Sequence, residues 1–344
     1  MRVVRLHAAG DLRPHEEPEP VPGPGEELVR VTAVGLCGSD RLWFVDGGIG
    51  DATLFRPLVL GHEIAGIVES GPRRGLRVAI DPADPCGRCD LCMAGRSNLC
   101  ASLRFAGHGS TDGGLRSRMA WPGRLLHPLP DAIPDAEGAL LEPLAIAIHA
   151  VDLGEVRPGM SAGVYGCGPI GLLLVQLLRL IGCAPVIATD RLAHRVAAAR
   201  AMGATDARRV DPDPKDPDAA RPASSVAESS VDVAFEVAGE DAAVADAVRS
   251  VRPGCPVILV GIPADDRTSF RASVARRKGI QLLLCRRMTA RDLPRAIRLV
   301  EAGRLELASL ISERHGIEAV GSAFASLVDR RGLKIIVEPA PADA

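Results

Sequence analysis

The sequence has no strong excess of either charge and no long hydrophobic run. Its 344 residues carry a formal net charge of −2, so composition gives no reason to expect nucleic acid or an anionic membrane as a partner. The most apolar stretch, from Ile170 to Ile181, has the length of a buried helix and is too short to span a bilayer. The sequence also has no internal repeat.

The N-terminal residues lack the apolar core of a secretory signal peptide, because charges and prolines interrupt them. The chain nevertheless contains nine cysteines. Since disulfides require an oxidising compartment, this many cysteines without an export signal indicate a reducing compartment and metal binding. We therefore expect a cytoplasmic protein, and its hydrophobic content of 47% is typical of a globular protein with substantial cores.

Four of the cysteines lie in one short loop with the spacing C-x2-C-x2-C-x7-C, namely Cys86, Cys89, Cys92 and Cys100. Four thiolates in such a loop can enclose one Zn²⁺ in a tetrahedral shell. Because four protein ligands leave no open position for a substrate, this metal would hold a loop in place. A disulfide cluster or scattered buried cysteines is the alternative interpretation. If the metal is structural, a catalytic metal has to be sought elsewhere in the chain.

Three blocks of different composition follow one another along the chain. Residues 1–147 are rich in glycine, proline and β-branched residues, which predicts short strands and turns. Residues 148–284 alternate apolar strands with helical patterns, as in βαβ units around a parallel sheet. We expect residues 285–344 to return to the first domain. The predicted fold class is α/β, with a mostly-β domain and a doubly wound parallel-sheet domain.

The second and third blocks predict individual elements. Strands are expected at 162–165, 185–189, 231–237, 257–260, 280–284 and 333–338, and helices from Ile170, Leu192 and Asp241 and over 291–302. The stretch 211–218 alternates proline with charged residues and predicts a solvated loop. The tail after Glu338 is predicted to fray.

A glycine motif follows the first strand of the second block. The strand at 162–165 leads into G-x-G-x-x-G and then a helix, in the run Gly166, Cys167, Gly168, Pro169, Ile170 and Gly171. The first glycine makes the tight turn, the second lets the backbone approach a pyrophosphate, and the third lets helix and strand pack closely. The helix N-terminus adds N–H groups and a positive dipole end. A plain turn is the alternative.

Asp190 ends the next strand, where an acid accepts hydrogen bonds from ribose hydroxyls and repels a 2′-phosphate. Arg191 follows directly, and a guanidinium there could instead bind a 2′-phosphate, stack on adenine or face solvent. Arg195 is a further candidate for this rim. We favour NAD over NADP, because Asp190 would place a negative charge against the phosphate.

Candidate ligands for a second metal lie upstream of the cysteine loop. Cys37 and His62 are good zinc ligands, and a carboxylate could be the third. Glu63 is adjacent to His62, and Glu142 lies at the start of an otherwise apolar helical segment, where a carboxylate is costly unless it is paired or bound to metal. Taken alone, the cysteine is also consistent with a small buried side chain and the histidine with a core residue.

Together these features resemble the zinc-containing medium-chain dehydrogenase family, over residues 26–339. The chain looks most similar to the sorbitol (L-iditol) and L-idonate dehydrogenase branch. The stretches that carry this resemblance are 35–40 (GLCGSD), 48–51 (GIGD), 57–63 (PLVLGHE), 142–150 (EPLAIAIHA) and 332–335 (GLKI). The resemblance implies a GroES-like catalytic domain (1–147), a Rossmann domain (148–284) and a return to the catalytic domain (285–344).

The resemblance also implies roles for individual residues. Cys37 and His62 match the catalytic zinc ligands, Glu63 matches an acid at the metal, bound directly or held in reserve, and Glu142 matches a carboxylate bound directly or through water. Asp40 matches a partner that orients the zinc histidine. The hydroxyl of Ser39 matches the group that passes the substrate proton. Two zinc ions per subunit follow, one catalytic and one structural.

The sequence departs from the branch at two places that concern the substrate. Leu42 stands where some alcohol-oxidising members have a histidine, and it cannot relay a proton. Arg286 matches an arginine that binds substrate hydroxyls, but the tyrosine beside it is replaced by Arg287. A second positive charge suits a sugar acid better than a neutral polyol, although Arg287 could simply face solvent.

The expected function is oxidation of a secondary alcohol of a polyol or sugar acid to the ketone, with hydride transfer to NAD(P). Threonine, butanediol and aminocyclitol dehydrogenases of the same family are alternatives. A non-catalytic protein that binds zinc and dinucleotide is an alternative of another class. The expected partners are a small-molecule substrate and further copies of the chain, in a homotetramer or homodimer.

Overall fold

The structure is a computed structural model and describes residues 1–210 and 226–339. The predicted solvated loop at 211–218 and the predicted frayed end of the chain after 339 lie outside the described residues. Contacts divide the chain into two compact units, Met1–Ala145 with Met288–Ala344, and Ile146–Arg287. The domain boundaries at 147 and 284, which are inferred from the sequence, remain predictions.

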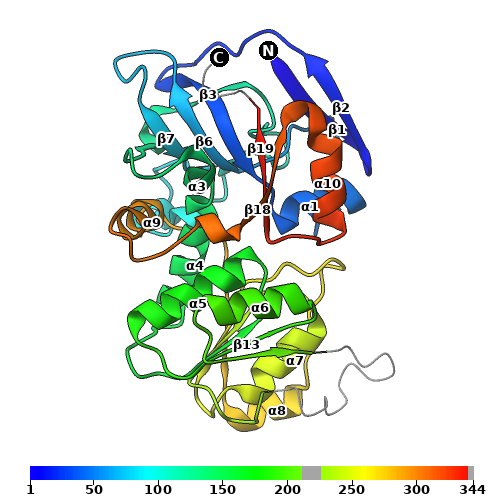
Figure 1. The fold of residues 1–344 in the computed structure, drawn as a ribbon, viewed down its shortest axis with the longest axis vertical. Helices are drawn as coiled ribbons and strands as arrows, with labels where there is room; N and C mark the ends of the chain where they lie inside the picture. Colours follow the sequence, from blue (N-terminus) through cyan, green and yellow to red (C-terminus); the bar gives the residue numbers. More distant parts are fainter. Residues whose placement is uncertain (211–225, 340–344) are drawn as a thin grey trace. The chain divides into compact units, whose positions relative to one another are not determined.

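A seven-stranded sheet forms the centre of the first unit (Figure 1). Its order is β11 (Leu126–Pro128), β7 (Arg77–Ile80), β6 (Glu63–Val68), β3 (Glu26–Gly35), β19 (Lys334–Glu338) and β18 (Ile311–Gly316), and β10 (Arg118–Pro122) also pairs with β3. Strand β19 is antiparallel to β3, with Ile336 opposite Gly35. Strand β19 therefore lies against the strand that leads to Cys37.

The apolar faces of this sheet are covered by helices and by a hairpin. The helices include α1 (Gly38–Asp46), α3 (Asp135–Ala139) and α10 (Val320–Val328), and the hairpin is β1 (Arg2–Ala8) with β2 (Asp11–Glu16). Helix α9 (Asp292–Glu301) belongs to the same unit. Buried aliphatic residues from β1, β3 and β6 pack in one core with Trp43 of α1 and Phe324 of α10. This core fixes α1, which begins next to Cys37.

The second unit contains a six-stranded parallel sheet. The strand order is β14 (Asp206–Arg209), β13 (Val186–Asp190), β12 (Ala162–Tyr165), β15 (Val233–Glu236), β16 (Pro256–Leu259) and β17 (Gln281–Leu284). The helices α5 (Pro169–Ile181), α6 (Ala193–Ala201), α7 (Asp241–Ser250) and α8 (Ala272–Lys278) connect the strands. The predicted α/β class with a parallel sheet is confirmed, and the predicted elements differ only at their ends.

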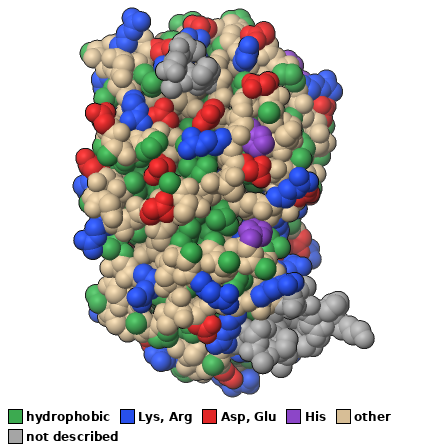
Figure 2. Space-filling view, viewed as in Figure 1, with side chains coloured by type: hydrophobic (Ala, Val, Ile, Leu, Met, Phe, Trp, Pro, Cys, Tyr) green, Lys and Arg blue, Asp and Glu red, His purple; other side chains and the backbone are tan. Residues whose placement is uncertain are grey.

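The surface agrees with the small net charge. Basic and acidic side chains are interspersed over the face shown in Figure 2, without a large area of one sign. No helix among the described residues combines the length and the apolar character that crossing a membrane requires.

Candidate functional site

Three potential metal ligands meet where β3, α1 and β6 join. Cys37 lies between the end of β3 and the first turn of α1, and His62 directly precedes β6, which begins with Glu63. The Cys37 sulfur, a His62 ring nitrogen and a Glu63 carboxylate oxygen all lie within 4.8 Å of one another. Three protein ligands with sulfur, nitrogen and oxygen donor atoms are typical of a catalytic zinc site. The residues therefore fit the ion that the sequence predicts.

Asp40, a residue of α1, forms hydrogen bonds with the backbone next to these ligands. Its side chain is buried, and its two carboxylate oxygens accept hydrogen bonds from the backbone N–H groups of Cys37 (2.9 Å) and Gly61 (3.2 Å). The Nδ1 atom of His62 lies 3.7 Å from the Asp40 carboxylate. The negative charge of the carboxylate favours a proton on Nδ1, which leaves Nε2 for a metal.

Glu63 is held by a buried lysine. Lys334 donates hydrogen bonds to both Glu63 oxygens, at 2.6 and 2.7 Å, and to the Leu36 carbonyl oxygen at 3.0 Å. Burial lowers the pKa of Lys334, but the negative charge of Glu63 outweighs this effect and raises the pKa above its usual value. Gly35 leaves room for the Glu63 carboxylate, because a Cβ at this position would lie 2.1 Å from a Glu63 oxygen.

Glu142 is the second buried acid near the three ligands. It lies in the first turn of α4 (Leu141–Leu153) and is 5% exposed. Burial raises its pKa to about 7, and the nearby charge of His62 acts in the opposite direction. Among the described residues we find no hydrogen-bond donor to its carboxylate, which is expensive for a buried acid in the absence of a cation. Ser39, in the first turn of α1, is half-buried.

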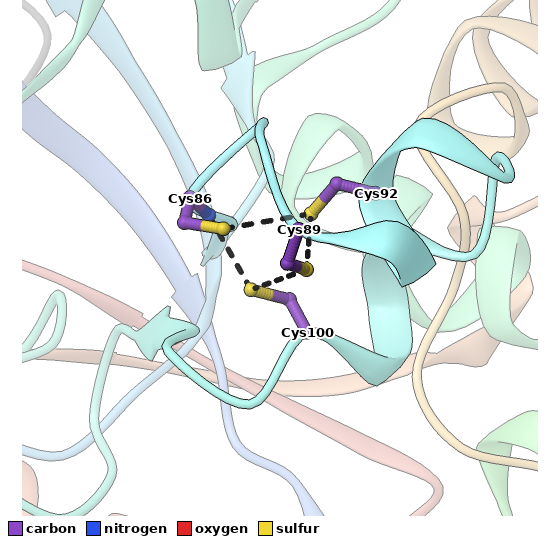
Figure 3. A group of neighbouring side chains, drawn as sticks. All are labelled: Cys86, Cys89, Cys92 and Cys100. Atoms are coloured by element: carbon purple, nitrogen blue, oxygen red, sulfur yellow. Dashed lines mark hydrogen bonds between the residues drawn. The ribbon is translucent and has the colours of Figure 1, made fainter.

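The cysteine quartet forms a compact cluster (Figure 3), whose side chains point toward one another. The sulfur–sulfur distances are 3.5 Å for Cys89–Cys92, 3.9 Å for Cys89–Cys100 and 4.0 Å for Cys86–Cys92. A tetrahedron with Zn–S distances of about 2.3 Å has edges of about 3.8 Å, so a zinc ion fits. All nine cysteines are free, which argues against the disulfide interpretation.

We expect replacement of Cys89 with serine to remove one zinc ion per subunit and to lower the thermal unfolding temperature. Three thiolates hold the ion less tightly, and the loop around α2 (Asp90–Met93) has little apolar core of its own. Mass spectrometry of the native protein and calorimetry measure the two effects, with Cys255→Ser as a control, because Cys255 belongs to neither group of potential ligands. Unchanged zinc content together with an unchanged unfolding temperature would contradict the structural role.

One buried acid near Glu142, Asp81, belongs to no recognisable sequence motif. Asp81 follows β7 and is 4% exposed, and one of its oxygens accepts a hydrogen bond from the Ala83 N–H at 2.9 Å. Burial raises its pKa to about 7, with the Ala83 N–H and Arg124 lowering it and Asp292 and Asp84 raising it. The folded protein therefore retains a proton that the unfolded chain releases near pH 4.

Replacing Asp81 with asparagine should stabilise the protein at about pH 8 and have little effect at about pH 4. The folded state prefers the protonated acid, so the free energy of unfolding falls as pH rises from about 4 to about 7. Above about pH 7 Asp81 causes no further loss of stability. The amide retains an acceptor for the Ala83 N–H. We expect a gain of about 1–4 kcal/mol in the free energy of unfolding at the higher pH, measured by denaturant titration. An equal change at both pH values would contradict this origin.

The glycine motif has the backbone form that a pyrophosphate site needs. Gly166 has φ of +109°, and a Cβ there would lie 2.8 Å from the Ala238 nitrogen. A Cβ at Gly171 would lie 1.9 Å from the Gly166 oxygen, so α5 packs directly on the turn. At Gly168 a Cβ would meet only the Arg195 guanidinium, at 3.7 Å, and this open approach fits a phosphate group. Pro169 begins α5 at its first turn, and Ile170 follows.

The acid and the arginines of the predicted nucleotide rim lie at the ends of β13 and β14. Asp190 is 9% exposed, and its two oxygens accept hydrogen bonds from the backbone N–H groups of Cys167 (2.7 Å) and Leu192 (2.8 Å). Arg191 is exposed and lies 3.1 Å from Glu240. Arg209, opposite Asp190 on β14, donates to the Arg191 carbonyl oxygen. The Asp190 carboxylate is therefore hydrogen-bonded to the glycine loop, and Arg191 and Arg209 lie near it.

The remaining residues that the sequence predicts for substrate binding lie at the end of the second unit. Arg286 is exposed, whereas Arg287 is half-buried and has φ of +58°, the left-handed region that a non-glycine residue rarely adopts. Sequence reasoning missed the interaction of Lys334 with Glu63, although a lysine at the start of a buried strand was a usable signal. It also missed Phe105, whose ring centroid lies 5.4 Å from that of His62.

The chain matches two family models. The "Alcohol dehydrogenase GroES-like domain" matches residues 23–131, and "Zinc-binding dehydrogenase" matches residues 169–302. Sorbitol dehydrogenase of Bacillus subtilis is 30% identical over 348 aligned positions, covering 98% of this chain and 97% of the relative. L-Idonate 5-dehydrogenase of Vitis vinifera is 33% identical over 300, covering 85% and 81%.

A solved structure is also similar. A putative zinc-binding dehydrogenase from Sinorhizobium meliloti 1021, described as bound to NADP, has a TM-score of 0.86 and 31% identity, with coverage of 98% of this chain and 99% of that one. The GroES-like and Rossmann assignments from the sequence are confirmed by these matches. The chain therefore belongs to the zinc-containing medium-chain dehydrogenase family, on its sorbitol and L-idonate dehydrogenase-like branch, and is an oxidoreductase.

Proposed function

We propose that the protein oxidises a secondary alcohol of a polyol or sugar acid to the ketone, with one catalytic zinc ion and a nicotinamide cofactor. The observation that carries this proposal is the meeting of Cys37, His62 and Glu63 within 4.8 Å, with Glu142 buried nearby. The relatives named sorbitol dehydrogenase and L-idonate 5-dehydrogenase support the substrate class. The fold alone would support many other substrates.

In this proposal Cys37 and His62 bind the metal, and Glu142 is the acid that completes the ligand set. Both Glu63 oxygens accept hydrogen bonds from Lys334, so Glu63 would serve better as a charge held in reserve than as a direct ligand. When bound, the zinc ion lowers the pKa of a substrate hydroxyl, and the nicotinamide ring accepts the hydride. Asp40 keeps the His62 ring oriented, and Ser39 accepts the hydroxyl proton on its way to solvent.

The proposed cofactor is NAD, with NADP as the second candidate. The Asp190 carboxylate lies close to the expected ribose position, although backbone N–H groups already occupy one site on each of its oxygens. Arg191, Arg195 and Arg209 supply positive charge at the same rim, and the NADP-bound structural relative is consistent with the second candidate. The ratio of kcat/KM for the two cofactors decides between them.

A substrate screen tests the proposed function. Sorbitol, xylitol, L-idonate, threonine and 2,3-butanediol are each incubated with NAD and NADP, and the reduced cofactor is followed by absorbance. We expect the highest kcat/KM with a polyol or with L-idonate, and preference for L-idonate would support a role of Arg286 and Arg287 toward a carboxylate. Preference for threonine or butanediol would contradict the proposed substrate class. Zinc and dinucleotide binding without any turnover would favour the non-catalytic alternative.

We also propose that the chain forms a homodimer or homotetramer in the cytoplasm. Strand β17 is the last strand of its sheet, carries no charged side chain, and leaves Leu284 76% exposed. An unprotected apolar edge of this kind is suited to pairing with a second copy. We expect Leu284→Lys to lower the mass measured by light scattering, with Val21→Lys, exposed but outside any strand, as the control. An unchanged mass would exclude this edge as the interface.

A further inference from the structure

An ion pair joins two loops at the carboxyl edge of the parallel sheet. Arg191 directly follows β13, and Glu240 lies between β15 and α7, at the N-cap of that helix. The Nη1 atom of Arg191 donates to the two Glu240 carboxylate oxygens, at 3.1 and 3.4 Å. Within residues 1–210 and 226–339, no other carboxylate lies at ion-pair distance from Arg191.

This ion pair spans the glycine loop. Strand β12 lies between β13 and β15 in the sheet, and the loop after β12 begins with Gly166. The Gly166 N–H donates to the Thr189 carbonyl oxygen at 2.9 Å, and a Cβ at Gly166 would lie 2.8 Å from the Ala238 nitrogen. The glycine loop is therefore packed between the two loops that carry the pair. A pyrophosphate bound at this loop would place the adenosine ribose beside Asp190 and Arg191.

The backbone is held in place on both sides of the ion pair. Arg209 donates from Nε to the Arg191 carbonyl oxygen at 3.1 Å. On the other side, the Glu236 carboxylate accepts a hydrogen bond of 2.6 Å from the N–H of Gly239, the residue before Glu240. The paired side chains themselves are 47% and 33% exposed. Because exposed ion pairs are weak in water, a ligand with a higher charge can compete for the arginine.

We propose that Glu240 is a specificity-determining residue that acts through Arg191, because the ion pair keeps the guanidinium from binding a 2′-phosphate and so favours NAD over NADP. This inference rests on the proposed function, in which the second unit binds a nicotinamide dinucleotide. A phosphate monoester carries more than one negative charge at neutral pH, and a guanidinium binds it through two parallel hydrogen bonds. To form these bonds, NADP must break the pair and leave the Glu240 carboxylate unpaired beside the phosphate. The neutral ribose hydroxyls of NAD require no such exchange.

Binding measurements without substrate test the proposal. Calorimetric titration of the zinc-loaded protein gives the dissociation constants Kd of NAD and NADP. Glu240→Gln keeps the size of the side chain and removes its charge, so we expect the ratio of the NADP Kd to the NAD Kd to fall about three- to tenfold. Glu240→Asp keeps a carboxylate and should keep most of the discrimination. Glu155→Gln is the matched control, because it removes an exposed carboxylate that precedes β12 and lies 3.7 Å from Arg157.

A second background separates an effect through Arg191 from a direct one. In Arg191→Met the guanidinium is absent, so adding Glu240→Gln should change the ratio less than about twofold. An equal change with and without Arg191 would overturn the proposal, because Glu240 would then act on the phosphate directly. An unchanged ratio in Glu240→Gln would also overturn it. So would an equal loss of affinity for both cofactors together with a lower unfolding temperature, which would indicate a structural role.

Failure of this inference is distinguishable from failure of the proposed function. If the unmodified protein binds NADP more tightly than NAD, the ion pair does not keep Arg191 from the phosphate, and the inference fails while the dehydrogenase function stands. If the unmodified protein binds neither dinucleotide, the proposed function itself fails, before any variant is compared.

Discussion

Replacing Cys37 with serine should lower kcat by at least about 10³-fold while the protein still folds and binds the dinucleotide. A neutral serine hydroxyl is a poor zinc ligand, and the ion provides several kcal/mol of charge stabilisation to the reacting hydroxyl. At about 1.4 kcal/mol for each factor of ten, loss of the ion explains an effect of this size.

The fold should tolerate this substitution. Cys37 is the N-cap residue of α1, a position that serine favours, and its backbone N–H can still donate to Asp40 at 2.9 Å. Zinc content should fall from two ions per subunit to one, and the unfolding temperature should change little. Cys167→Ser in the glycine loop serves as the control outside the metal group. Near-normal turnover in Cys37→Ser would show that the catalytic metal is assigned to the wrong residues.

Replacing Lys334 with methionine should lower the free energy of unfolding by about 3–5 kcal/mol. The substitution keeps a linear apolar stem but leaves Glu63 buried, charged and without its partner. The Leu36 carbonyl oxygen also loses its 3.0 Å hydrogen bond from the ammonium group. Denaturant unfolding of both proteins, each saturated with zinc, measures the difference.

A second substitution isolates the ion pair. Adding Glu63→Gln to Lys334→Met removes the unpaired charge, so the double variant should recover part of the lost stability. We expect Lys334→Arg to be milder than Lys334→Met, because a guanidinium keeps the charge. If Lys334→Met is as stable as the unmodified protein, the ion pair does not hold this part of the structure. If the double variant is no better than the single one, the loss comes from packing.

Features that depend on neighbouring residues could be predicted from the sequence. The cysteine quartet closes within fifteen residues, so its spacing alone specifies a tetrahedral cluster. The glycine motif is equally local, because Gly166 and Gly171 meet within one turn between β12 and α5. The parallel sheet was predictable because apolar strands and helical patterns alternate with the periodicities of the two structures.

Features that join distant segments could not be derived in the same way. Lys334 and Glu63 are 271 residues apart, and only the pairing of β19 with β3 brings them together. The contact between the loop at Gly107–Gly113 and Gly61 is another close approach across the chain, as is the surrounding of Asp81 by Arg124 and Asp292. No periodicity encodes such meetings, because they follow from which strands become neighbours in the sheet.

The pairing of β19 with β3 has a consequence for synthesis on the ribosome. Cys37, His62 and Glu63 emerge early, and the whole second unit is made before Lys334. Until β19 is inserted, the Glu63 carboxylate lacks the ammonium group that compensates its burial. The N-terminal residues can therefore form their sheet only incompletely until β19 has emerged, and we expect the metal ligands to reach their final arrangement only after that strand is inserted.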